Sequence, residues 1–240
     1  YQDRHDYKRC VRALQRALHI RDMFDDEDST PQIDDALVFV ELARALMALG
    51  AYDQVALDHF YSAVGILEHV NLHLAKNGTQ KSAIVPRVIE GGLESNGDEH
   101  GTNELLLECH SSILILIRRQ RTDIPDDEDR ICEVIHRIGN SQAALGQYEK
   151  SLKSLTHVLQ FQRSAQGNDR LIVADLLFNL GNIYVEVNQK ELARECHQEC
   201  HEITSEILGK DSIELAENMI CLGNIEFLSN NFLLALDWFD

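Results

Sequence analysis

Two cysteines and two histidines, in the order Cys-His-x-x-Cys-His at residues 196–201, are the side chains in this sequence best suited to chemistry. Thiolates and neutral imidazoles are ligands that Zn²⁺ prefers in proteins. On a helix, however, each residue is turned by about 100° from the one before it, so the cysteine pair and the histidine pair point in different directions. Four such side chains cannot meet at one tetrahedral point, and we therefore predict no metal site here.

Two acidic runs with the sequence Asp-Asp-Glu-Asp, at residues 25–28 and 126–129, could offer carboxylates to Ca²⁺. Neither run is followed by the glycine and the distal glutamate of a calcium-binding loop, so we predict solvated loops between helices. The chain also contains no glycine-rich phosphate loop, nucleophile elbow or His-Glu metal motif. The sequence therefore predicts no catalytic residue, no cofactor and no enzyme activity.

A third set of polar side chains recurs every 42 residues and suits the recognition of a polypeptide. Each asparagine of the set follows a carboxylate by seven residues, which is close to two helical turns, so the two groups share a helix face. Amides can pair with the backbone of an extended segment, and carboxylates favour lysine or arginine side chains on it. The predicted partner is a protein or peptide segment that is extended and basic or neutral. The candidate binding residues are Asn140, Asn182, Asn224, Glu133, Asp175 and Glu217, with Arg137 and Asn179 at a third equivalent position.

The same residues have a purely structural alternative. The asparagines could cap or bridge neighbouring helices, and the carboxylates could stand near helix starts because the helix dipole favours negative charge there.

The 42-residue interval itself indicates an internal repeat. Leu180-Gly181-Asn182 and Leu222-Gly223-Asn224 repeat Ile138-Gly139-Asn140, and Gly167-Asn168-Asp169 aligns with Gly209-Lys210-Asp211 in the same register. Apolar spacing predicts two helices in each period, and Gly181 on the buried face of a helix predicts the close approach of a neighbouring helix. The predicted helices cover residues 130–145, 148–164, 171–187, 191–208, 212–228 and 232 onward.

These motifs resemble the tetratricopeptide repeat, and the 42-residue period is similar to the longer repeats of kinesin light chains. The resemblance implies an all-α fold, an α-solenoid of antiparallel helix pairs wound into a right-handed superhelix. It also implies a concave groove lined by the first helix of each pair, where the candidate binding residues would lie. In such repeats Cys200 falls at a small buried position and His197 at a large buried one. Kinesin light chains hold acidic peptides in basic grooves, whereas this chain carries Arg137, Asn179 and Cys221 at one groove position, so the relatives' cargo is not carried over.

The repeat pattern divides the chain into three parts. Residues 1–75 carry tetratricopeptide-like repeats, of which the first is truncated, and residues 106–240 carry further repeats, of which the last is truncated. Between them, residues 76–105 are rich in glycine and predict an irregular insertion or loop. The truncated patterns at both ends favour a fragment of a longer protein.

Composition narrows the possible functions. The formal charge is −18, with 40 acidic and 22 basic side chains, which argues against nucleic acid as a partner. No apolar run approaches the roughly 20 residues of a membrane-spanning helix, so we predict no membrane insertion. The six cysteines lie within helical patterns, which favours reduced thiols and an intracellular, cytoplasmic location. We expect a protein-interaction scaffold or adaptor. The alternatives are a structural subunit of a larger assembly and a regulatory module of a larger enzyme, and the oligomeric state stays open.

Overall fold

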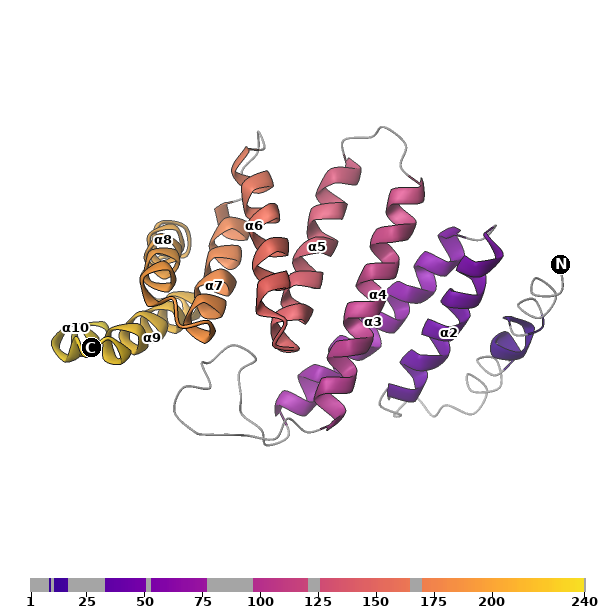
Figure 1. Ribbon diagram of the computed structural model, residues 1–240, viewed down its shortest axis with the longest axis horizontal. Coiled ribbons are helices and arrows are strands. Elements are labelled where there is room, and N and C mark those ends of the chain that lie inside the picture. The colour runs from indigo at the N-terminus through magenta and orange to yellow at the C-terminus, as the bar shows by residue number, and fades with distance from the viewer. Residues whose placement is uncertain are drawn as a thin grey trace. The chain divides into compact units, whose positions relative to one another are not determined.

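The computed structural model describes residues 9, 11–16, 33–50, 53–76, 97–120, 126–164 and 170–239, and every regular element among them is an α-helix. This confirms the predicted all-α fold (Figure 1). The chain divides into two compact units. The first contains residues 1–80 and 95–138, and the second contains residues 81–94 and 139–240.

The first unit is built from α2 (Ile33–Leu49), α3 (Asp53–Lys76), α4 (Gly97–Gln120) and the first part of α5 (Asp126–Ala144). Among the described residues its core is mainly aliphatic, with the ring of Phe60 fully buried in it and Phe39 partly buried against it. Helix α3 packs against both α2 and α4. Leu57 and Leu67 of α3 and Ile113 of α4 are among the core side chains, and burial of such residues is the main force that holds the helices together.

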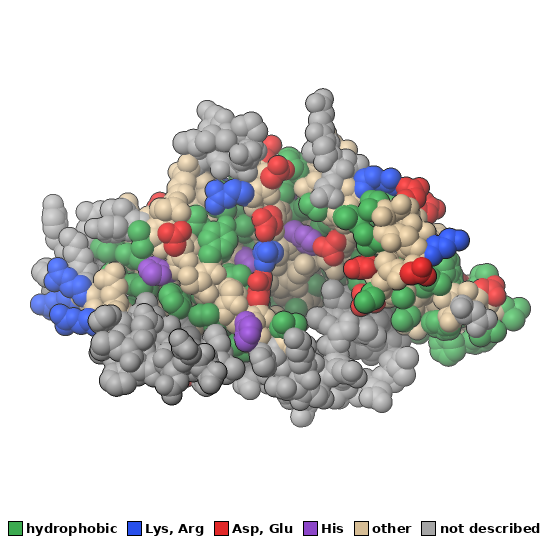
Figure 2. Space-filling view, turned by 180° about the vertical axis from the view of Figure 1, so that it is seen from behind, with side chains coloured by type: hydrophobic (Ala, Val, Ile, Leu, Met, Phe, Trp, Pro, Cys, Tyr) green, Lys and Arg blue, Asp and Glu red, His purple; other side chains and the backbone are tan. Residues whose placement is uncertain are grey.

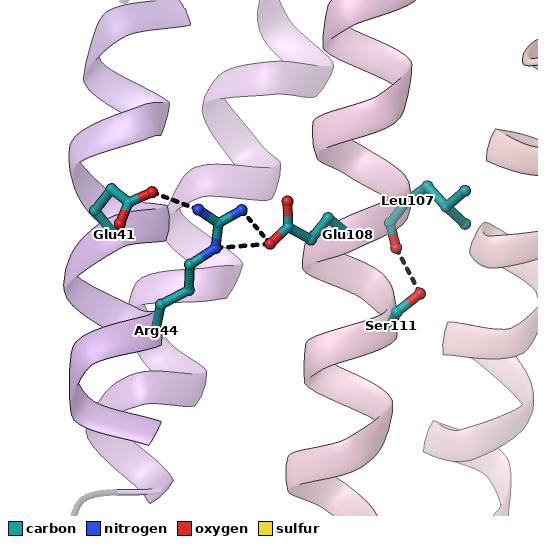
Figure 3. Close-up of polar contacts among 5 residues, drawn as sticks. All are labelled: Glu41, Arg44, Leu107, Glu108 and Ser111. Atoms are coloured by element: carbon teal, nitrogen blue, oxygen red, sulfur yellow. Dashed lines mark hydrogen bonds and ion pairs between the residues drawn. The ribbon is translucent and has the colours of Figure 1, made fainter. Parts of the chain in front are cut away.

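Charged groups join helices of this unit at its surface. Arg44 of α2 donates from Nε to Oε1 of Glu108 on α4 at 2.7 Å, and it also pairs with Glu41 one turn earlier on its own helix (Figure 3). Arg137 of α5 pairs with Glu68 of α3. Because these side chains are about half exposed, such pairs orient the helices more than they stabilise them.

The second unit contains the end of α5 followed by α6 (Tyr148–Ser164), α7 (Arg170–Glu186), α8 (Lys190–Leu208), α9 (Ile213–Leu228) and α10 (Phe232–Phe239). The predicted bounds of α6 to α9 agree with the observed ones to within one residue. The turns inside successive helix pairs share one geometry, with positive φ at Gly146 (+71°), Asn188 (58°) and Asn230 (62°). Glycine and asparagine adopt this left-handed conformation most readily, which explains their recurrence at 42-residue intervals.

The glycine of each repeat lies where two helices come closest. A Cβ atom added to Gly181 would lie 2.6 Å from Nε2 of His197, which is fully buried on α8. Gly139 and Gly223 face Leu155 and Phe239 in the same way, and the three facing residues are themselves 42 positions apart. The prediction that Gly181 permits a close helix approach is therefore confirmed.

Two local predictions were wrong. Residues 97–105, predicted to be irregular, form the start of α4, because Thr102 and Leu106 are buried in the core and this burial outweighs the cost of Gly101 in a helix. The acidic run 126–129 begins α5 and is not a loop, in keeping with the preference of carboxylates for helix N-termini. Residues 77–96 and the acidic run 25–28 lie outside the described part of the chain.

His110 of α4 offers a test of the first unit's core. Its side chain is 4% exposed, and neither ring nitrogen has a hydrogen-bond partner. A buried donor without an acceptor costs about 1 to 3 kcal/mol, so we expect His110→Leu to raise the free energy of unfolding by about 1 kcal/mol at pH 7.

The gain in the free energy of unfolding of the His110→Leu variant should be larger at acidic pH. Burial, helped by the charge of Arg137, lowers the pKa of His110 to about 4. Between pH 6.5 and 4 the unfolded chain binds a proton that the folded chain does not, so the wild type loses stability as the pH falls. Urea unfolding at pH 7 and pH 5 measures both effects. A leucine variant that is less stable than the wild type at both values would contradict this account.

Candidate interaction surface

The carboxylates of the predicted ladder are exposed. Asp175 on α7 and Glu217 on α9 lie at equivalent positions, 42 residues apart, and both side chains reach solvent. The positions that surround Asp175 in the middle of α7 are mostly buried, so Asp175 is the charged group that this stretch of the helix exposes. In the second unit these two carboxylates therefore lie at the surface.

The asparagines behave differently from one another. Asn140 near the end of α5 is exposed and Asn224 on α9 is half-buried, whereas Asn179 and Asn182 on α7 are each only 6% exposed. The Sγ of Cys221 on α9 donates to Oδ1 of Asn182 at 3.7 Å, so Asn182 bridges two first helices. Asn182 therefore bridges neighbouring helices, as the alternative interpretation of the asparagines proposed. Its Nδ2 is buried without a hydrogen-bond partner.

The remaining ladder residues belong to the first unit. Glu133 and Arg137 are exposed on α5, four residues apart, and Arg137 donates from NH2 to Oε1 of Glu133 at 3.3 Å. Since Arg137 also pairs with Glu68, its charge is neutralised within the chain. This position therefore offers an acidic partner little attraction, unlike the basic groove of kinesin light chains.

The Cys-His pattern on α8 serves packing. His197 donates from Nδ1 to Oδ1 of Asn218 on α9 at 2.7 Å, and Nδ2 of Asn218 returns a hydrogen bond to the carbonyl of His197 at 2.8 Å. Cys200 is 4% exposed, as its small buried position predicts, and burial raises the pKa of Cys196 and Cys200 to about 11. Both thiols therefore stay protonated at neutral pH.

Within the described ranges, no three histidine, cysteine, aspartate or glutamate side chains gather closely enough to hold a metal ion. The described cysteines are free thiols, namely Cys109, Cys132, Cys196, Cys200 and Cys221. None of the helices that the structure describes is long and apolar enough to cross a membrane.

A second polar network links α8, α9 and the start of α10. The carboxylate of Glu226 is 5% exposed, and it accepts hydrogen bonds from Nε of Arg194 at 2.5 Å and from Nδ2 of Asn231 at 2.7 Å. The bond from Arg194 lowers the pKa of Glu226, so the group stays ionised. The network fixes the turn that orients the last described helix.

Neither the His197–Asn218 pair nor the Glu226 network was predicted from the sequence, although the repeat pattern contains an indication of the first. Asn218 stands where the preceding repeats carry Leu176 and Val134, which are buried. A single polar residue at a position that is otherwise apolar calls for a buried partner. Glu226 aligns with Tyr184 and Gln142, which are also polar, so the repeat pattern did not indicate that Glu226 would be buried.

Comparison with known proteins gives a family for part of the chain and a fold for most of it. Residues 130–203 match the tetratricopeptide repeat. The structure of BtubC (BKLC) from P. vanneervenii is similar over 89% of this chain and 72% of its own, with 17% identity and a TM-score of 0.54. The apo form of RapI is similar over 85% of this chain and 67% of its own, with 11% identity and a TM-score of 0.50. No curated protein matches the chain in sequence.

The repeated glycine contacts, the shared turn geometry and the family match agree with one another. Residues 130–203 belong to the tetratricopeptide repeat family, and the described helices around them form an α-solenoid of the same type.

Proposed function

We propose that this protein is a non-catalytic interaction scaffold that binds an extended segment of a protein partner along the first helices of the second unit. The observation that carries the proposal is the exposure of Asp175 and Glu217 at one repeat position on successive first helices. Two carboxylates in one register favour lysine or arginine side chains spaced along a partner. Asn140 and the half-buried Asn224 offer amides to its backbone.

The charge of the chain supports a basic or neutral partner over an acidic one. A formal charge of −18 repels acidic segments and raises the association rate of basic ones. The free thiols agree with an intracellular site of action, which we include in the proposal.

Asn182 and Asn179 are proposed to position helices and not to contact the partner. Both side chains are buried, and Cys221 of α9 contacts Asn182 directly, so neither lies open to a partner. We propose that they position the two first helices, and that Asp175, Glu217, Asn140 and Asn224 make the contacts.

A capture experiment with matched variants tests the proposal. The variant Asp175→Ala, Glu217→Ala removes two exposed carboxylates from first helices, and Glu195→Ala, Glu202→Ala removes two from the second helix α8. We expect partners retained by the wild type from cell lysate to be lost at least tenfold with the first variant only. All three proteins should have the same circular dichroism spectrum and melting temperature.

If the partners are lost with the α8 variant instead, the protein is better described as a structural subunit of a larger assembly. If the α8 variant loses the partners and the first-helix variant keeps them, the binding surface lies on second helices and the proposal is wrong.

A further inference from the structure

Helix α7 exposes a carboxylate that has an apolar side chain on either side of it along the helix. Leu171 lies one turn before Asp175 and Phe178 lies one turn after it, so the three side chains fall within an arc of about 60°. Leu171 is 40% exposed, Asp175 is exposed and Phe178 is half-buried. A group that approaches Asp175 therefore meets apolar surface as well as negative charge.

The neighbouring helices leave these groups at the surface. Helices α6, α8 and α9 all pack against α7, and together they bury most of its side chains. The ring of Phe178 contacts the buried ring of His197 on α8 edge to face, with centroids 5.4 Å apart, so its position is fixed by the core. Because the exposed positions of α7 lie on one side of the helix, the accessible part of this ring borders Asp175.

The same order of residues recurs in the next repeat. Helix α9 carries Ile213, Glu217 and Ile220 at the equivalent positions, 42 residues later. Helix α5 also has an acid at this position, but its flanking residues are the polar Asp129 and His136. An acid between apolar residues is therefore a property of α7 and α9 and not of every first helix.

The apolar neighbours affect which cation the carboxylate binds best. The ammonium of lysine is compact and strongly hydrated, so it loses favourable hydration where apolar side chains displace water. The guanidinium of arginine is planar and less strongly hydrated, and it can donate two parallel hydrogen bonds to a carboxylate while it lies on an aromatic ring. Asp175 and Phe178 provide these two contacts within one helical turn.

We propose that Leu171, Asp175 and Phe178 form a subsite that selects arginine over lysine in the bound partner segment. The guanidinium pairs with the carboxylate of Asp175 and lies against the ring of Phe178, and Leu171 contacts the apolar stem of the arginine. This inference rests on the proposed function and narrows it, because it names the side chain that the partner places on α7.

The charge and the surface of the protein match such a side chain. The formal charge of −18 attracts cationic segments and repels acidic ones. Figure 2 shows acidic side chains in red beside apolar side chains in green on one face of the described part of the chain. Arginine suits a surface of this kind because it combines a positive charge with an apolar stem.

Fluorescence anisotropy with two labelled octapeptides tests the subsite. One peptide alternates arginine with serine and the other alternates lysine with serine, so the two have the same length and charge. We expect the wild type to bind the arginine peptide about fivefold more tightly, which is the size of effect that one cation–π contact at a surface gives.

Variants of the two central residues assign the preference to this place. Phe178→Leu removes the ring but keeps an apolar side chain, and Asp175→Asn removes the charge at an exposed position with little change of shape. Each should reduce the preference for arginine below about twofold. Phe178→Tyr keeps the ring and should keep the preference, as should the control Glu195→Ala on α8. If circular dichroism shows that Phe178→Leu is unfolded, the comparison of Asp175→Asn with Glu195→Ala decides.

The subsite and the proposed function fail in different ways. Equal affinity of the wild type for the two peptides overturns the subsite, and so does a preference that persists in Asp175→Asn. The proposed function fails if Asp175→Ala, Glu217→Ala binds both peptides as tightly as the wild type does. A wild type that binds neither peptide overturns both.

Discussion

Replacing Gly181 by alanine is expected to lower the free energy of unfolding by about 2 to 3 kcal/mol, although alanine is the better helix former. The added Cβ would lie 2.6 Å from Nε2 and 2.7 Å from Cδ2 of His197. The ring has no space to retreat, because it is fully buried and its Nδ1 is bonded to Asn218. Moving it would break that bond and leave a buried amide oxygen unpaired. Urea unfolding followed by circular dichroism measures the loss.

Two further variants separate this clash from a general effect of alanine. Gly101→Ala on α4 places a Cβ with nothing within 4 Å of it, so it should raise stability by up to about 1 kcal/mol. In a His197→Ala background the clash is gone, and Gly181→Ala should then raise stability by up to about 1 kcal/mol. If Gly181→Ala is equally harmful with and without the histidine, the packing explanation is wrong.

Removing the charge of Arg194 is expected to have a similarly large effect. Arg194→Met keeps the length of the side chain but leaves the carboxylate of Glu226, only 5% exposed, without its cation. A buried charge that loses its partner typically costs 3 to 5 kcal/mol, and because Asn231 still donates to Glu226 we expect a loss of about 3 kcal/mol. Chemical unfolding at pH 7 provides the measurement.

The matched control is Arg163→Met. Arg163 also pairs with a glutamate, Glu199, at 2.6 Å, but both side chains are about half exposed, so we expect a loss below about 1 kcal/mol. If both variants lose the same free energy of unfolding, the burial of Glu226 is not the reason for the effect of Arg194→Met.

The effect of pH on the Arg194→Met variant follows from the lowered pKa of Glu226 in the wild type. In the wild type the pKa of Glu226 lies below its unfolded value, so its contribution is present at neutral pH and is lost as the pH falls through the folded pKa. Without Arg194, burial favours the protonated acid, and the difference in stability between variant and wild type should shrink at pH 4.5. A difference that grows in acid would contradict the pairing.

Helix positions in the second unit could be predicted because each is set by local chemistry. Each helix pair contains its own apolar spacing, its turn, as at Asn188, and its packing glycine, as at Gly181. These features recur in three successive repeats, which makes them recognisable in the sequence. The start of α4, residues 97–105, was not predicted, because its glycines are tolerated only through the burial of Thr102 and Leu106 by other helices.

The candidate site was predicted less well for a related reason. Sequence spacing places Asp175 and Asn182 on one side of α7, but it does not say how near the next first helix comes. Cys221 of α9 contacts Asn182 and covers it, whereas Asp175, two turns earlier, stays exposed. The ion pair of Glu226 with Arg194 likewise depends on which surfaces the neighbouring helices cover.

The binding face of the second unit is tested most directly by site-specific photocrosslinking in cells. A benzophenone amino acid replaces Leu171, one turn before Asp175 on α7, in one protein and Glu195 on α8 in the other, both at exposed positions. We expect the substitution at Leu171 to capture a partner through an extended segment of basic or neutral residues, mapped by mass spectrometry, and the substitution at Glu195 not to do so. Capture from Glu195 alone, or of an acidic segment from Leu171, would contradict the proposed binding face.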